Sequence, residues 1–207
     1  MEYFSTRDPA LRATAAEAIL RGLAPDGGLY MPEKLPAFPM ERLENMGDRD
    51  ISLSVLSSVF EDIPSDVLSR AIAAAYDTNF DGGDIAPQHP LGDAHVMELF
   101  HGPTCAFKDV ALTLLPHLLI AARDRCGVSD EICILTATSG DTGSAALYGF
   151  ADVPGTRILV FYPAGGVSQA QEKQMVTRAG RNVSVAAVRG NFDDAQSGVK
   201  AIFRTLT

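Results

Sequence analysis

Residues 132–150 read ICILTATSGDTGSAALYGF, and this stretch decides the fold. Its first part, ICILT (132–136), is a short apolar run rich in β-branched residues, which is typical of a buried strand. Small and hydroxylated residues follow at 138–144, and the apolar residues then return at helical spacing up to Phe150. A strand that leads through a tight turn into a helix is one half of a βαβ unit, the building block of a parallel sheet.

The same alternation of strand-like and helix-like runs extends in both directions from this stretch. The expected strands are 96–100, 132–136, 157–162 and 183–188. The expected helices are 104–125, 142–150, 168–179 and 191–207. Thr104 and Asn191 are suitable caps for the first and last of these helices, and Pro116 predicts a kink in the first. The sequence therefore predicts an α/β fold, with a parallel sheet and flanking helices.

Residues 1–93 have a different pattern. Helical patterns at 13–22 and 64–76 are separated by a stretch with several prolines and glycines, which favours loops. We therefore expect a mostly helical N-terminal cap domain at 1–93, followed by an α/β domain at 94–207. Because a parallel sheet of three or four strands looks unfinished where the sequence stops, we expect the second domain to be incomplete at its C-terminus.

Composition and charge exclude several classes of protein. Hydrophobic residues make up 46% of the 207 residues and charged residues 21%, which is ordinary for a globular protein. The net charge of −9 disfavours nucleic-acid binding, which needs a basic surface. No apolar run approaches the roughly 18–20 residues of a membrane span, so we expect no membrane contact and a cytoplasmic location. The spacing of the three cysteines and four histidines predicts no metal site.

One lysine stands out in the segment HGPTCAFKD (101–109). Lys108 lies off the apolar stripe of the expected helix, in the first turn after Thr104. The positive end of a helix dipole repels a cation there and so favours a neutral, nucleophilic amine, as Schiff-base chemistry requires. The alternative is a solvated lysine without a special role, which is the more common case for an isolated helix.

The turn TATSGDTGS (136–144) is the second candidate site. Its glycines and hydroxyls can bring backbone amides close to an anion at a helix N-terminus. The Walker A pattern is absent, and G-x-G-x-x-G is absent too, so a dinucleotide is disfavoured. The alternative is an ordinary turn capped by Asp141 or Thr142.

Two further glycine-rich turns follow. In GNFDD (190–194) the aspartates would repel an anion, which favours plain helix capping. The turn GGVS (165–168) follows a strand, at the sheet edge where open α/β folds bind ligands.

Taken together, HGPTCAFKD (101–109) and TATSGDTGSAA (136–146) strongly resemble the threonine synthases, pyridoxal-phosphate enzymes of the tryptophan synthase β-like fold (fold type II). Other segments resemble the same family in the same order: YFSTRDP (3–9), LAPDGGLYMP (23–32), FYPAGGVSQAQEKQM (161–175) and RGNFDDAQSGVKAIF (189–203). The resemblance extends over the whole chain and covers roughly the first half of a family member. It makes the functional interpretation of Lys108 much stronger than the lysine alone does.

The resemblance implies a lyase that converts O-phospho-L-homoserine and water to L-threonine and phosphate, the last step of threonine biosynthesis. It also implies that Lys108 holds pyridoxal 5′-phosphate covalently and acts as the catalytic base. The implied cofactor-binding residues are Lys108, Ser139, Gly140, Asp141, Thr142 and Gly143. The implied substrate-binding residues are Thr138, Ser139, Thr142 and Lys173.

Other implications of the resemblance are weaker. His101 and Phe107 would flank the cofactor ring, with a core or capping role as the alternative, and PDGGLY (25–30) would lie near the substrate. The family's second glycine-rich loop, which cradles the cofactor phosphate, lies further along than this sequence reaches.

Two other functions remain open: a pyridoxal-phosphate-dependent serine or threonine dehydratase-like enzyme, and a non-catalytic truncated fragment. Apolar surface left uncovered by the missing part would favour self-association.

Overall fold

The computed structural model describes residues 1–38 and 40–206, and these form two compact units. The first unit contains 1–77 and 117–129, and the second contains 78–116 and the chain from 130 onward. The chain therefore passes between the units three times. The boundary that we expected at residue 93 falls inside the second unit, and the division into two domains at that residue stays a prediction.

The first unit combines a small antiparallel sheet with helices. Its strands, in the order β2-β1-β3, are β1 (Tyr3–Ser5), β2 (Arg12–Ala13) and β3 (Tyr30–Pro32). Its helices are α1 (Ala15–Arg21), α2 (Met40–Leu43), α3 (Asp48–Val59), α4 (Ser65–Tyr76) and most of α6 (Leu115–Arg125). The expected helices at 13–22 and 64–76 are present, whereas α3 and the sheet were not anticipated.

The core of the first unit is built on α4. Leu68 and Ile72, four residues apart, are almost completely buried, and so are Ala71 and Ala75 on the same face. This spacing is that of an amphipathic helix, which is why the pattern at 64–76 predicts α4.

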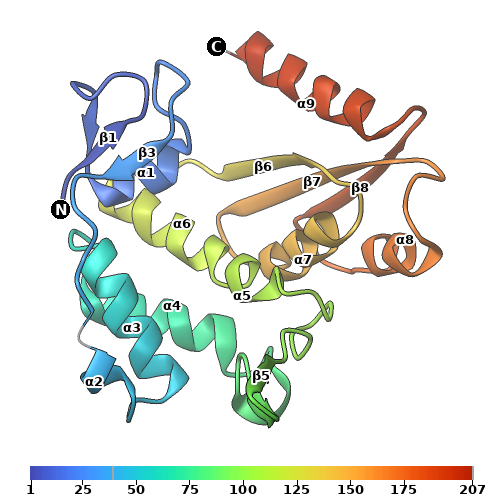
Figure 1. The fold of residues 1–207 in the computed structure, drawn as a ribbon. Helices are drawn as coiled ribbons and strands as arrows, with labels where there is room; N and C mark the ends of the chain where they lie inside the picture. The colour runs from blue at the N-terminus through green and yellow to red at the C-terminus, as the bar shows by residue number, and fades with distance from the viewer. Residues whose placement is uncertain (39, 207) are drawn as a thin grey trace. The chain divides into compact units, whose positions relative to one another are not determined.

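The second unit contains the expected parallel sheet. Its strands β6 (Ile132–Ala137), β7 (Thr156–Pro163) and β8 (Val183–Val188) pair in that order, all parallel. The helices α7 (Asp141–Phe150) and α8 (Gln169–Val176) lie on one face of the sheet, and α9 (Phe192–Leu206) lies on the other (Figure 1). The central strand β7 contributes the fully buried side chains of Ile158 and Val160. This arrangement confirms the α/β prediction.

The strand expected at 96–100 is not part of the parallel sheet. Residues Ala94–Met97 form β5, which pairs antiparallel with β4 (Gln88–Leu91) in an exposed hairpin after the short 3-10 turn η1 (Asp81–Gly83). Only Gly92 and Asp93 separate the two strands, and a two-residue turn with a glycine at φ 60° favours local pairing. The prediction was wrong because strand propensity does not identify the partner strand.

The helix expected at 104–125 is two helices, α5 (Asp109–Leu112) and α6. The break comes just before Pro116, because proline lacks the N–H that a continuous helix needs and is tolerated in a first turn. Thr104 does not cap this helix: Lys108 occupies the N-cap position, without a side-chain capping bond. Thr104 instead bonds to Asp109, as described below.

The last helix begins as expected. The side chain of Asn191 accepts a hydrogen bond from the backbone N–H of Asp194 at 3.0 Å, and the Asp194 carboxylate accepts one from the N–H of Asn191 at 2.8 Å. This reciprocal capping confirms that 190–194 is a helix start. Thr207, where we expected the helix to end, lies outside the described residues. Within the described ranges, no helix has both the length and the apolar character needed to cross a membrane.

Candidate functional site

The loop before Lys108, residues 101–108, is held by one buried carboxylate. Asp109 is completely buried, and it accepts hydrogen bonds from the backbone N–H of Thr104 at 2.8 Å and from the Thr104 hydroxyl at 2.6 Å. A Cβ on Gly102 would lie 2.5 Å from the Cβ of Asp109, so only glycine fits against this carboxylate. We call residues 101–108 the lysine loop.

Lys108 is half-buried at the end of the lysine loop. Its Nζ lies 4.3 Å from the centre of the Phe107 ring, and Phe107 is 60% exposed. Because α5 is only one turn long, the helix dipole at Lys108 is much weaker than the dipole of the continuous helix that we expected. The placement of this amine therefore depends on the loop rather than on a long helix.

His101 is engaged at the start of the lysine loop. Its Nε2 lies 2.6 Å from a carboxylate oxygen of Glu98, and its ring stacks on Phe100 at 4.7 Å. The hydrogen bond with His101 lowers the pKa of the Glu98 carboxyl. Phe107 lies beside the lysine amine, whereas His101 is tied to Glu98. A role of either residue at a cofactor ring stays a prediction.

The second loop, residues 138–143, follows β6 and leads into α7; we call it the hydroxyl loop. It is held by Thr138, whose side chain is 1% exposed. The Thr138 hydroxyl accepts hydrogen bonds from the N–H of Gly140 at 3.0 Å and from the N–H of Gly143 at 2.9 Å. A Cβ on Gly143 would overlap the Thr138 side chain. Thr138 thus serves the loop itself, and Ser139, Asp141 and Thr142 are left exposed.

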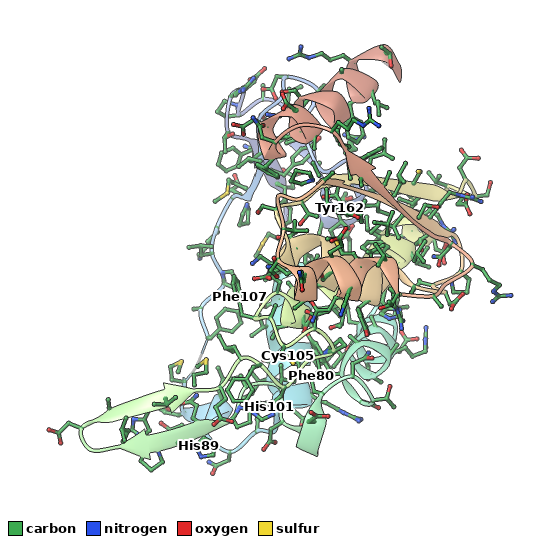
Figure 2. The ribbon with its side chains drawn as sticks, turned by 90° about the vertical axis from the view of Figure 1, so that its right-hand side faces the viewer. Phe80, His89, His101, Cys105, Phe107 and Tyr162 are labelled. Carbon is green, nitrogen blue, oxygen red and sulfur yellow. The ribbon has the colours of Figure 1, made fainter. Side chains whose placement is uncertain are left out.

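Helix α8 links the two loops. The Gln171 side-chain amide donates to Asp141 in the hydroxyl loop at 2.7 Å, and that of Gln174 donates to the carbonyl oxygen of Thr104 at 3.3 Å. Cys105 and Phe107, on the lysine loop, can be located in Figure 2, as can Tyr162 on β7. Helix α8 therefore links the lysine loop to the hydroxyl loop, which follows β6 at the carboxyl edge of the sheet.

The helices that follow the two loops also touch. A Cβ on Gly149 of α7 would overlap the carbonyl oxygen of Leu112, at the end of α5. The backbones of α5 and α7 therefore approach as closely as a glycine allows, which fixes the lysine loop against the helix of the hydroxyl loop.

Lys173 lies on α8 but outside this group. Its side chain is exposed, and helical spacing places it on a different face from Gln171 and Gln174. Its expected role in substrate binding stays a prediction.

The segment 25–30 lies in the first unit and forms a tight loop of its own. The buried Ser5 hydroxyl donates to the Asp26 carboxylate at 2.8 Å, and the backbone N–H of Gly28 donates to Asp26 at 2.9 Å. The bond from Gly28 lowers the pKa of Asp26. A Cβ on Gly28 would overlap the Ser5 hydroxyl. These contacts assign the segment a structural role within the first unit.

Sequence reasoning missed two residues of the site, Asp109 and Gln174. A charged residue directly after Lys108 suggested no buried role, because aspartate is rarely buried without partners. For Gln171 a signal existed: Ser168 and Gln171 have the spacing of a capping box, which the structure contains.

A cavity of about 470 Å³ lies elsewhere, in the first unit. It is lined by α1, the end of α6 and Asp62, and it contains none of the candidate site residues. Among the described residues, no group of three or more histidine, cysteine, aspartate or glutamate side chains is placed to hold a metal ion.

Comparison with known proteins agrees with the fold and the motifs. The family model described as "Threonine synthase N terminus" matches residues 2–76. The chain is 38% identical to threonine synthase from Methylobacillus glycogenes over 214 residues, covering 98% of this chain and 45% of that protein. It is also 38% identical to threonine synthase from Saccharomyces cerevisiae, covering 97% of this chain and 42% of that protein.

Solved structures give the same result. A PLP-bound threonine synthase from Brucella melitensis superposes with a TM-score of 0.90 at 38% identity, over 99% of this chain and 44% of that one. Threonine synthase from yeast gives a TM-score of 0.87 at 38% identity, over 98% of this chain and 43% of that one. The chain spans less than half the length of these relatives. By sequence and by fold, the chain matches the N-terminal portion of threonine synthases.

Proposed function

We propose that this chain is the lysine-bearing part of a pyridoxal-phosphate-dependent threonine synthase, with Lys108 as the residue that holds the cofactor. The observation that carries the proposal is that α8 links the loop of a half-buried lysine to the hydroxyl loop at one edge of a parallel sheet. The solved relative from Brucella melitensis is described as PLP-bound, and its match to this chain supports the same cofactor here.

The side chains present fit the reactive end of this cofactor. A primary amine at Lys108 is the group that an aldehyde requires, and the exposed Ser139 and Thr142 offer hydroxyl donors to an anion. Asp109 and Thr138 make the internal hydrogen bonds of the two loops, and Ser139 and Thr142 are exposed.

When bound, pyridoxal phosphate supplies an electron sink for negative charge at the substrate α-carbon. Lys108 would hold the cofactor covalently through its Nζ. Once released from that bond, the Lys108 amine is the base available in the lysine loop to take a proton from the substrate. The exposed hydroxyls of Ser139 and Thr142 are suited to bind the substrate carboxylate.

The proposed reaction is the conversion of O-phospho-L-homoserine and water to L-threonine and phosphate, with a cytoplasmic location. The sequence resemblance and the matched relatives support it. Self-association is proposed on the exposed apolar side chains of the β4–β5 hairpin, Leu91, Val96 and Met97. Sedimentation over a range of concentrations tests it, and a monomer at all concentrations would contradict it.

Covalent labelling tests the role of Lys108. The chain is incubated with pyridoxal 5′-phosphate and reduced with borohydride, and the labelled lysine is identified by peptide mass spectrometry. We expect label at Lys108 and its loss in Lys108→Ala. Lys200→Ala is the matched control, because Lys200 lies on α9 with its amine bonded to Gln196 at 2.9 Å. Equal labelling of all lysines would overturn the proposal.

Product analysis tests the reaction. Phosphate released from O-phospho-L-homoserine supports the proposed activity, whereas ammonia released from threonine, without phosphate release, would indicate a dehydratase instead.

A further inference from the structure

Two glutamines on α8 contact the two loops of the candidate site. Gln171 and Gln174 are three residues apart, so they lie on neighbouring positions of one helix face. One donates to the Asp141 carboxylate in the hydroxyl loop, and the other donates to the Thr104 carbonyl oxygen in the lysine loop. The loops are 30 and 70 residues away from their respective glutamines along the chain.

The orientation of the Gln171 amide is fixed by the helix itself. Its oxygen accepts a hydrogen bond from the backbone N–H of Ser168 at 3.0 Å, as part of the capping box that begins α8. The nitrogen of the same amide therefore points away from the cap and donates to Asp141. Gly140 packs against this amide, because a Cβ on Gly140 would overlap the Gln171 side chain.

Helix α8 is anchored to the sheet on its other side. Met175 is fully buried, and the Tyr162 hydroxyl of β7 donates to the Glu172 carboxylate at 2.9 Å. This hydrogen bond raises the pKa of the Tyr162 phenol. An anchored helix that bonds to both loops sets the distance between them.

We propose that Gln171 and Gln174 are positioning residues, which hold the hydroxyl loop at a fixed distance and orientation from Lys108. The inference rests on the proposed function, because it assigns the glutamines a task only if both loops serve one ligand. Neither glutamine touches the ligand. Each acts through the loop that it bonds.

A charge swap separates this role from helix capping. In Gln171→Glu the oxygen that accepts from Ser168 is kept, so the capping box survives, but a carboxylate then faces Asp141 and repels it. Adding Asp141→Asn restores the hydrogen bond in the opposite direction: the amide at position 141 donates, and the carboxylate at position 171 accepts. If Gln171 only caps the helix, Gln171→Glu should behave like the unmodified chain, because the capping box survives in this variant.

The first readout is the rate of borohydride-trapped labelling of Lys108 by pyridoxal 5′-phosphate in the whole chain. Loss of one charge-assisted hydrogen bond predicts a rate about tenfold lower in Gln171→Glu, with recovery to within about twofold in the double variant. Gln169→Ala, on the exposed side of the same first turn, is the control and should label at the normal rate. An unchanged rate in Gln171→Glu, or a double variant no faster than the single one, overturns the proposal.

Hydrogen exchange gives a readout that needs no cofactor. We expect peptides covering 101–109 and 136–144 to exchange faster in Gln171→Glu and Gln174→Ala, and to regain protection in the double charge-swap variant. If Lys108 of the unmodified chain takes no label, the proposed function fails, and exchange alone then decides the inference. Unchanged exchange in the two loops would show that α8 does not hold them.

Discussion

The lysine loop is held by a buried carboxylate, whereas the hydroxyl loop is held by a buried hydroxyl. Each loop is held by one side chain that accepts two hydrogen bonds, Asp109 through its two carboxylate oxygens and Thr138 through its single hydroxyl oxygen. A glycine packs directly against each of them: Gly102 against Asp109, and Gly143 against Thr138. The side chains that we propose to perform chemistry are not used to hold the loops: Ser139 is exposed and Lys108 is half-buried. The comparison teaches that the residues that shape each loop differ from those that we propose to perform the chemistry.

The charge of the holding group is the main difference between the loops. A buried carboxylate is costly to remove from water and is stable only when its hydrogen bonds are made, whereas a buried hydroxyl costs less. The lysine loop should therefore depend more strongly on its holding residue than the hydroxyl loop does.

Asp109→Ala should have the largest effect. It removes two hydrogen bonds to a charged acceptor and leaves the buried Thr104 donors unsatisfied, which predicts a loss of about 3 kcal/mol in the free energy of unfolding. Urea unfolding followed by circular dichroism measures it. Asp109→Asn keeps the shape and one acceptor, and it should lose less. A loss in Asp109→Ala no greater than that in Thr138→Val would break the comparison.

Alanine at the two packed glycines comes next. Gly102→Ala should cost about 2 kcal/mol, because the new methyl group meets the Asp109 side chain and the buried carboxylate has no space to move into. Gly143→Ala should cost less, since alanine gains about 1 kcal/mol of helix propensity over glycine in α7. Gly198→Ala in α9 is the control, because nothing lies within 4 Å of its Cβ position, and it should be neutral or stabilising. The same unfolding assay compares the three.

Thr138→Val sharpens the contrast between the two holding groups. Valine keeps the buried shape but leaves the N–H groups of Gly140 and Gly143 without the hydroxyl acceptor, which predicts a loss of about 1–2 kcal/mol. Thr142→Val removes an exposed hydroxyl of the same loop and should have little effect on unfolding. If both valine variants lost the same amount, the buried hydroxyl would not be what holds the loop.

The loop at 25–30 of the first unit resembles the two loops, because Gly28 packs against the buried hydroxyl of Ser5. Here we expect the smallest effect on stability. The folded state lowers the pKa of Asp26 below its usual value of 3.8, chiefly through the hydrogen bond from Gly28. The stabilisation by ionised Asp26 is therefore complete above that pH, and it is lost as the pH falls through the lower value of the folded protein.

Asp26→Asn should accordingly unfold at a lower urea concentration than the unmodified chain at pH 7. The difference between the two urea midpoints should narrow below pH 3.8. Asp93→Asn, in the exposed hairpin turn, is the control and should show no such convergence. A difference in urea midpoint that stays constant from pH 7 down to about pH 3 would show that ionised Asp26 does not stabilise the fold.

The sequence predicted the parts of the fold that depend on local pattern. The strands β6, β7 and β8 and the helices between them follow from apolar periodicity and capping residues such as Asn191, which act over a few positions. The hairpin at 88–97 was missed because strand propensity alone does not show which strands pair. Here the short turn between the two strands makes them pair with each other.

For the candidate site, the sequence identified Lys108 and the hydroxyl loop but not what holds them. Thr104 and Asp109 are only five residues apart, but their residue types do not show that the chain turns back there to bury the carboxylate. The link from Gln174 to Thr104 spans 70 residues, so no short window of sequence contains it. Only the tertiary structure shows that Thr138 is enclosed while its neighbour Ser139 is exposed.

Gly149 has a consequence for how freely this sequence can vary. Because α5 and α7 meet there backbone to backbone, any side chain would push the lysine-bearing segment away from the helix that follows the hydroxyl loop. Position 149 should therefore accept only glycine, although we assign this residue no role in the chemistry. In a saturation library it would be among the most restricted positions of α7, a constraint imposed by the absence of a side chain.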